Sequence, residues 1–213
     1  MEDTYRHQAL RRQLVEGLRR QSIADERVLT AMEKLPRHFF IEKAFEEWAY
    51  QDKPFPIGCE QTISQPWTVA FQTALLQVEK RQKILEIGTG SGYQAAVLAL
   101  MGARVFTIER HQPLYEKARS MMKALGLGGV RCYYKDGYLG LPEMAPFDRI
   151  LVTCGAPEIP AQLITQLSVG GIMVIPVGIK QQRMIRLIKR SETEWETQDH
   201  GDFRFVPFLS GTA

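Results

Sequence analysis

The sequence contains few cysteines, and their spacing does not fit a metal site or a disulfide framework. Its 213 residues include Cys59, Cys132 and Cys154, an odd number with no CxxC pair. Disulfides persist in oxidising compartments, whereas cytoplasmic thiols stay reduced. We therefore expect free thiols, a cytoplasmic location and no bound metal.

Long apolar runs are also missing. The N-terminal stretch MEDTYRHQAL carries charge from its second residue, which is not the pattern of a signal peptide. No run approaches the roughly 18 consecutive apolar residues that a membrane helix needs. These absences predict a protein with no membrane partner.

A strong excess of charge is the third absence. The net charge of +3 is too small to indicate a nucleic-acid partner by itself. Arg11, Arg12, Arg19 and Arg20 do gather in the first predicted helix. A solvated helix face is the plainer interpretation of these arginines, and contact with phosphates is the alternative. We expect no nucleic-acid partner and, without any sign of an obligate oligomer, a monomer.

Regular alternation of strands and helices begins near residue 67. Short apolar strands are predicted at 83–88, 104–109, 130–136, 148–154, 171–178 and 184–190, and helices at 67–78, 92–101, 112–125 and 160–167. This order is typical of an α/β fold with a doubly wound, mostly parallel sheet. The region 184–208 has strand signals without helices between them, so we expect antiparallel edge strands there.

The first 66 residues have a different pattern. Helical spacing is predicted over 4–20 and 24–35, followed by an irregular stretch over 37–66 with prolines at 54, 56 and 66. Long irregular stretches inside compact domains are often functional. We expect one domain of 213 residues, in which 1–66 form a helical, substrate-binding extension and 67–213 form a cofactor-binding core.

The stretch EIGTGSG, residues 86–92, joins a predicted strand to a predicted helix. Glycine permits tight turns and close approach of a ligand, and the helix N-terminus offers unpaired N–H groups. An ordinary turn of this kind needs one or two glycines, whereas three alternate here. The spacing GxGxG differs from the dinucleotide fingerprint GxGxxG, and the lysine of a phosphate-binding P-loop is absent.

An acidic residue followed by three alternating glycines resembles the first motif of class I S-adenosylmethionine-dependent methyltransferases. The resemblance implies that the loop passes under the amino-acid and sulfonium end of the cofactor, S-adenosyl-L-methionine. The residues that it assigns to the cofactor are Glu86, Gly88, Thr89, Gly90 and Gly92.

Two more strand ends agree with a nucleotide site. Glu109 ends the next strand, where a carboxylate can accept hydrogen bonds from both ribose hydroxyls. Asp136 and Gly137 end the third strand, where Asp136 can accept from the adenine amine and Gly137 leaves room for the ring. Taken alone, Glu109 could equally be an acidic residue on the surface, and Asp136 with Gly137 could equally form an ordinary turn. Their position at successive strand ends favours a single nucleotide site.

The stretch PIGCEQTISQPW, residues 56–67, resembles the hallmark segment of the protein-L-isoaspartate (D-aspartate) O-methyltransferase family. Similar blocks follow that family's order from about residue 35, with small departures at Glu60, Lys135 and Cys154. The further blocks are PRHFFI (36–41), LEIGTGSGYQAAVLA (85–99), DGYLGLPEMAPFDRILVT (137–153), PEIP (157–160), GGIMVIPVG (170–178) and RFVPF (204–208).

This resemblance implies methylation of L-isoaspartyl residues at their free α-carboxylate, and of D-aspartyl residues, in damaged peptides and proteins, which starts their repair. It implies Ser64 as the active-site residue, although the residue types alone suggest only a turn before Pro66. We expect residues 54–66 and the region from Arg204 to Phe208 to form the walls of a shallow peptide groove. The expected substrate-binding residues are Gln61, Thr62, Ile63, Arg204 and Val206.

Other acceptors fit the sequence less well. Methyltransferases of exocyclic base amines carry D/N-P-P-Y/F after the fourth strand, where this sequence reads TCGAPEIP. Cys154 lacks the Pro-Cys context of carbon methylation, so we expect it to pack in the interior. An RNA or small-molecule methyltransferase and a cofactor sensor without catalysis remain the alternatives.

Overall fold

The computed structural model describes residues 2–21, 23 and 25–213. Two helices open the chain, α1 (Tyr5–Arg20) and α2 (Glu26–Lys34), and each has a side-chain cap at its N-terminus. The hydroxyl of Thr4 accepts from the His7 N–H, and Asp25 accepts from the Arg27 N–H. Residue 24, the predicted start of the second helix, lies outside the described residues.

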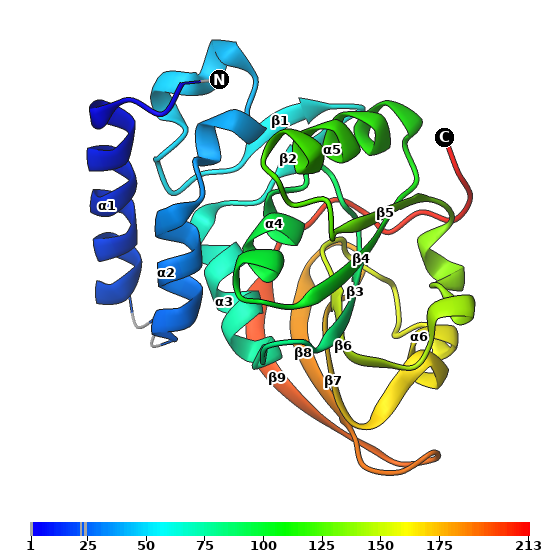
Figure 1. Ribbon diagram of the computed structural model, residues 1–213. Coiled ribbons are helices and arrows are strands. Elements are labelled where there is room, and N and C mark those ends of the chain that lie inside the picture. Colours follow the sequence, from blue (N-terminus) through cyan, green and yellow to red (C-terminus); the bar gives the residue numbers. More distant parts are fainter. Residues whose placement is uncertain (1, 22, 24) are drawn as a thin grey trace.

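A mixed sheet forms the centre of the molecule (Figure 1). In the described residues it contains seven strands in the order β5-β4-β3-β6-β7-β8-β9. The strands β3, β4, β5, β6 and β7 pair in parallel, and β8 and β9 add antiparallel pairs at one edge. The predicted α/β class, the mostly parallel sheet and the antiparallel edge are confirmed. The strands span Lys83–Ile87 (β3), Arg104–Glu109 (β4), Arg131–Tyr134 (β5), Phe147–Val152 (β6), Leu167–Val177 (β7), Gln182–Lys189 (β8) and Trp195–Phe203 (β9).

Helices cover both faces of the sheet (Figure 1). The helices α1 to α5 pack against one face, and α6 with two short 3-10 helices packs near the other. None of the helices in the described ranges is both long enough and apolar enough to cross a membrane. From residue 66 onward the helices are α3 (Pro66–Leu76), α4 (Tyr93–Leu100), α5 (Gln112–Ala124), α6 (Ala161–Gln166), η3 (Gly137–Leu139) and η4 (Pro142–Met144).

Successive residues of the central strands alternate between two hydrophobic cores. In β3, Ile84 belongs to the core shared with the N-terminal helices, whereas Leu85 and Ile87 belong to the core beside α6. This period of two places strand side chains on opposite faces. Because the first core joins residues from both sides of position 66, the N-terminal helices pack as part of the same body. The functional division at residue 66 stays a prediction.

The expectation of an irregular stretch over 37–66 is wrong in part. This segment contains the 3-10 helices η1 (Arg37–Phe40) and η2 (Lys43–Trp48) and a hairpin of β1 (Phe55–Gly58) and β2 (Gln61–Ile63). The hairpin turns through Cys59 and Glu60, whose φ angles are 52° and 57°. Short hairpins need such left-handed residues, and Cys-Glu is not a pair that signals them in a sequence.

We expect Glu60→Gly to stabilise the protein. Glycine adopts a positive φ without the steric cost of a Cβ atom, so the free energy of unfolding should rise by roughly 0.5–1 kcal/mol. Glu42→Gly is the matched control, because exposed Glu42 has an ordinary φ of −64° and should lose stability instead. Urea unfolding measures both variants. Equal effects of the two substitutions would contradict a strained turn at Glu60.

Candidate active site

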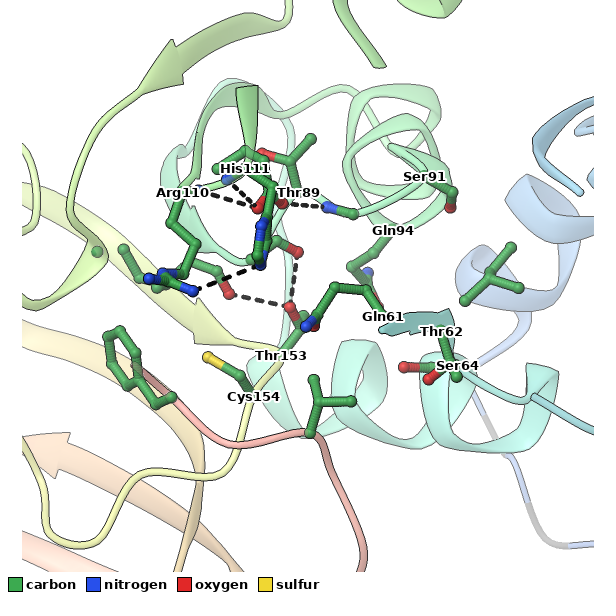
Figure 2. Close-up of a pocket in the computed structure, with 18 of the residues that line it drawn as sticks. Gln61, Thr62, Ser64, Thr89, Ser91, Gln94, Arg110, His111, Thr153 and Cys154 are labelled. Carbon is green, nitrogen blue, oxygen red and sulfur yellow. Dashed lines mark hydrogen bonds between the residues drawn. The ribbon is translucent and has the colours of Figure 1, made fainter. Parts of the chain in front are cut away.

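A pocket opens at the carboxyl ends of the parallel strands, where open α/β sheets bind ligands. The space between its walls is about 850 Å³, a figure that includes solvent at its open mouth. Three segments form its wall: residues 61–64, the strand ends with their following loops, and residues 206–209. Figure 2 shows Ser64 and Thr62 well separated from Arg110 across this pocket.

The acceptor segment predicted from the sequence lies in this wall. Gln61, Thr62, Ile63 and Ser64 all line the pocket. The hairpin strand β2 fixes the segment on one side of Ser64, and helix α3 begins at Pro66 on the other side. The carboxylate of Asp52 accepts from the Trp67 N–H at 2.8 Å, and so satisfies one of the free donors of the helix N-terminus.

The glycine loop lies beneath the pocket, and Gly88, Thr89 and Gly90 line it. Gly88 has a φ of 96°, and a Cβ atom there would lie 2.5 Å from the hydroxyl oxygen of Thr153. That hydroxyl donates to the carbonyl oxygens of Ile87 and Gly88, at 2.9 and 2.7 Å. Glycine is therefore required at 88 by its backbone conformation and by the close packing of the next strand end.

The carboxylate of Glu109 holds two pocket loops together. It lines the pocket, is 4% exposed and accepts from three backbone N–H groups. The N–H of Gly90 donates to Oε2 at 2.8 Å, and those of Arg110 and His111 donate to Oε1 at 2.9 Å each. Charged hydrogen bonds of this kind fix both the carboxylate and the backbone around it.

Glu86 lies behind the loop and does not line the pocket. Its side chain is fully buried, and neither carboxyl oxygen has a hydrogen-bond partner among the described residues. Burial raises the pKa of Glu86 to about 8, because the charged form loses its hydration, and nearby Glu109 adds to the shift while the Thr107 hydroxyl opposes it. The carboxyl is therefore neutral at pH 7 in the ligand-free protein.

Three other predicted site residues lie outside the pocket lining, whereas Gly137 and Val206 are part of it. Gly92 begins helix α4 and packs closely against α5, since a Cβ atom there would lie 2.8 Å from Met122. The carboxylate of Asp136 accepts from the N–H groups of Tyr138 and Gly211, at 2.9 and 2.7 Å. Arg204 is exposed to solvent. Ligand contacts of these residues stay predictions.

Several lining residues were not singled out from the sequence. Arg110 and His111 directly follow Glu109, and Tyr93 directly follows the glycine loop. Cys154, expected to pack, is 8% exposed and also reaches the pocket wall, where burial raises the pKa of its thiol far above the ordinary range. For Arg110, His111 and Tyr93, the sequence signal was their position directly after a recognised motif.

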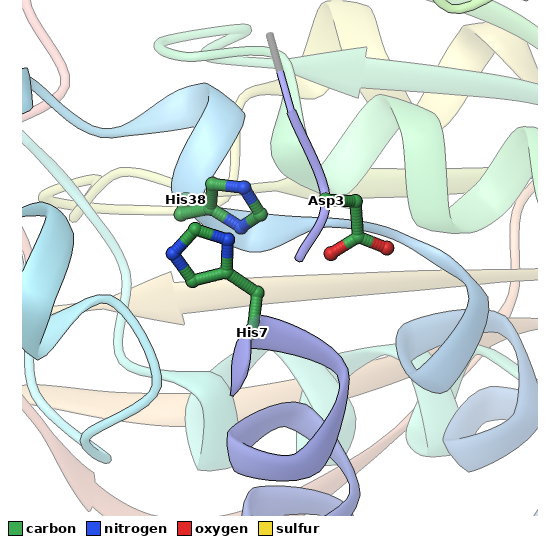
Figure 3. A group of neighbouring side chains, drawn as sticks. All are labelled: Asp3, His7 and His38. Atoms are coloured by element: carbon green, nitrogen blue, oxygen red, sulfur yellow. The ribbon is translucent and has the colours of Figure 1, made fainter. Parts of the chain in front are cut away.

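A cluster of Asp3, His7 and His38 lies away from this pocket (Figure 3). The two imidazole rings lie nearly face to face, 3.9 Å apart and tilted by 32°. His38 Nε2 already contacts the carbonyl oxygen of Glu2, at 3.0 Å. Both Asp3 oxygens bind the guanidinium of Arg11, at 3.0 and 2.8 Å, and His38 Nδ1 pairs with the Tyr50 hydroxyl at 2.7 Å. We assign this cluster to the anchoring of the N-terminus.

Comparison with known proteins decides the family. Residues 9–213 match the family model for protein-L-isoaspartate(D-aspartate) O-methyltransferase. The chain belongs to this family. Protein-L-isoaspartate O-methyltransferases of Christiangramia forsetii and Cytophaga hutchinsonii are 53% and 54% identical to it, over 98% of this chain and 98% and 95% of theirs.

Solved structures agree with this family and with its fold. A protein-L-isoaspartate O-methyltransferase matches 92% of this chain with a TM-score of 0.85 and 29% identity, and the match covers 65% of that chain. A candidate member from Plasmodium falciparum, in complex with S-adenosyl-L-homocysteine, has a TM-score of 0.82 and 25% identity, with coverage of 95% and 98%.

The pocket residues fit S-adenosylmethionine, the cofactor of this class of methyltransferases. The cofactor contains two ribose hydroxyls, an ammonium group and a sulfonium. The carboxylate of Glu109 is held in place and is of a type that accepts hydrogen bonds from hydroxyls, and the absence of side chains at Gly88 and Gly90 leaves the backbone open to a ligand. Neutral Glu86 has unused hydrogen-bonding capacity behind the loop.

We expect Glu109→Gln to weaken cofactor binding. An amide cannot accept from three N–H groups and two hydroxyls with the strength of a carboxylate, so the Kd for S-adenosylhomocysteine should rise about 10- to 100-fold. Isothermal titration calorimetry measures this change. Glu116→Gln, on the exposed surface of α5, is the control. A Kd within about threefold of wild type would argue against ribose binding by Glu109.

The raised pKa of Glu86 predicts that the stability of the protein depends on pH. Because its pKa rises from 4.5 to about 8 on folding, the folded state holds a proton that the unfolded state loses. This contribution is complete below pH 4.5 and is lost as the pH rises towards 8, with a slope of up to about 1.4 kcal/mol per pH unit.

Glu86→Gln should remove that part of the pH dependence. Urea unfolding at pH 5 and pH 8 should show a smaller loss for the variant than for wild type. The control is Glu47→Gln at an exposed position, which should follow the wild-type curve. If wild type and Glu86→Gln lose stability in parallel, Glu86 is not the buried acid that we describe.

Proposed function

We propose that this chain transfers a methyl group from S-adenosylmethionine to the free α-carboxylate of L-isoaspartyl residues, and to the side-chain carboxylate of D-aspartyl residues, in damaged peptides and proteins. The observation that carries the proposal is the shared pocket. Ser64 and its neighbours, the glycine loop and Glu109 all line one space, so acceptor and cofactor sites adjoin. Membership of the family supports the same activity.

The reaction requires no proton transfer by the protein. When bound, the cofactor supplies a methyl group on a positively charged sulfonium. The free α-carboxylate has a reference pKa of roughly 3.5, so it is ionised at neutral pH and needs no general base. One carboxylate oxygen forms a bond to the methyl carbon as the bond from that carbon to sulfur breaks, and no proton moves. The protein therefore contributes by orientation and by exclusion of water, which can lower the barrier by several kcal/mol.

Ser64 is the proposed acceptor-positioning group. Its hydroxyl donates to the substrate carboxylate and so orients one oxygen towards the methyl group, with Gln61, Thr62 and Ile63 as neighbouring contacts. Its location between a hairpin strand and a helix N-terminus limits the movement of its backbone. Val206 and its neighbours form the opposite wall, and Arg204 is an outer contact for the peptide.

We also propose a cytoplasmic, monomeric enzyme with no nucleic-acid partner. All three cysteines are free thiols, in keeping with a reducing compartment. Two of the four N-terminal arginines already have acidic partners, since Arg11 pairs with Asp3 and Arg19 pairs with Glu16 and Glu26, which weakens the case for a phosphate-binding face.

Two peptides that differ at one residue test the proposed reaction. The protein is incubated with methyl-labelled S-adenosylmethionine and either an L-isoaspartyl peptide or its L-aspartyl counterpart. Base-labile label should appear on the isoaspartyl peptide alone. Absence of label from both peptides, with cofactor binding intact, would reject the repair activity, and RNA would then be the next acceptor to test.

We expect Ser64→Ala to reduce kcat about 10- to 100-fold while the Kd for S-adenosylhomocysteine stays within about threefold. The lost hydroxyl orients only the acceptor, so the defect should appear in turnover. Ser120→Ala, at an exposed position on α5, serves as the control. Equal losses of turnover and cofactor affinity would indicate that Ser64 supports the pocket as a whole.

A further inference from the structure

A buried arginine contacts the backbone of the acceptor segment. Arg37 belongs to η1 and is 0% exposed. Its Nη2 donates to the carbonyl oxygen of Ser64 at 2.8 Å, and its Nε donates to that of Ala49 at 3.1 Å. A longer contact of 3.5 Å joins Nη2 to the carbonyl oxygen of Lys53. One guanidinium therefore connects three parts of the N-terminal segment.

The same guanidinium also reaches the cofactor half of the pocket. Its central carbon lies 4.9 Å from the centroid of the Tyr93 ring, within the range of a cation–π interaction. Tyr93 opens helix α4 directly after the glycine loop and lines the pocket. Arg37 thus lies between the residue proposed to orient the acceptor and the helix that follows the cofactor loop.

Arg37 is buried without an ion pair. It forms none with any described residue, and its Nη1 has no hydrogen-bond partner in the part of the chain described. The charge of Asp52 favours the protonated guanidinium from a longer distance. Desolvation lowers its pKa to about 10, so it still carries a charge at neutral pH. Burying a charge without an ion pair costs free energy, and an apolar residue of similar size is often at least as stable. Stability alone therefore does not account for arginine here.

We propose that Arg37 is a positioning residue for methyl transfer, which fixes the Ser64 carbonyl, and through it the Ser64 side chain, relative to the helix that begins at Tyr93. Only a planar guanidinium presents several donors in fixed directions while its face stacks on an aromatic ring. The role in catalysis rests on the proposed function. The effect of Arg37 on the backbone at Ser64 does not.

Two substitutions separate the role of Arg37 in positioning from a role in stability. Arg37→Lys keeps the positive charge but loses the planar set of N–H donors of the guanidinium. Arg37→Met removes the charge at similar length, and so should fold even if the lysine variant does not. For each folded variant, kcat/KM for an isoaspartyl peptide should fall about 10- to 100-fold, as expected for a misplaced reacting group. The Kd for S-adenosylhomocysteine should stay within about threefold.

Arg149→Lys and Arg149→Met are the matched controls. Arg149 also donates to backbone carbonyls, those of Leu76 at 2.7 Å and Gln77 at 3.3 Å, and it does not line the pocket. These variants should lose stability and keep kcat/KM within about threefold of wild type. Retention of wild-type kcat/KM by a folded Arg37 variant would overturn the catalytic role, as would an equal loss in the controls.

Amide hydrogen exchange tests the positioning independently of the reaction. The N–H of Trp67, three residues after Ser64, donates to Asp52 at 2.8 Å, so its exchange is protected and should accelerate at least tenfold in Arg37→Met and not in Arg149→Met. Unchanged exchange at Trp67 would reject the proposal. If wild type fails to methylate any isoaspartyl peptide but Trp67 exchange accelerates as expected, the proposed substrate is wrong and the positioning role remains.

Discussion

The carboxylate of Glu109 is the constraint on which the arrangement of the pocket depends. Its three backbone hydrogen bonds join the glycine loop after β3 to the turn after β4, two loops that would otherwise leave several N–H groups buried without partners. The carboxylate itself stays in place because those donors surround it. The same group that organises the loops is therefore a fixed acceptor for a ligand, as an electrostatically prepared site requires.

The two ends of the pocket are built from distant parts of the sequence. Strand ends and their loops line the side that we propose for the cofactor, whereas residues 61–64 line the side that we propose for the acceptor. Asp52 and Arg37 hold this second side by contacts with the backbone of Trp67 and Ser64. Contacts from the N-terminal segment therefore set the backbone position of Ser64.

Part of this structure was predictable from the sequence, for physical reasons. The apolar runs around Leu85 and Ile108 gave the parallel strands, and the glycines from 88 to 92 gave the cofactor loop, because few other residues tolerate that backbone. The hairpin turn at Cys59 and Glu60 was not predictable, since neither residue type favours the positive φ angles that both adopt. The contact of Arg37 with Ser64 also could not be predicted from the sequence, because it joins residues 27 positions apart through a side chain.

A crystal structure with S-adenosylhomocysteine and an isoaspartyl peptide bound together would show whether one pocket holds both ligands. We expect the ribose hydroxyls on the carboxylate of Glu109 and the free α-carboxylate of the peptide at the Ser64 hydroxyl, with its oxygen facing the sulfur. A ribose bound away from Glu109, or a peptide carboxylate bound away from residues 61–64, would contradict this expectation.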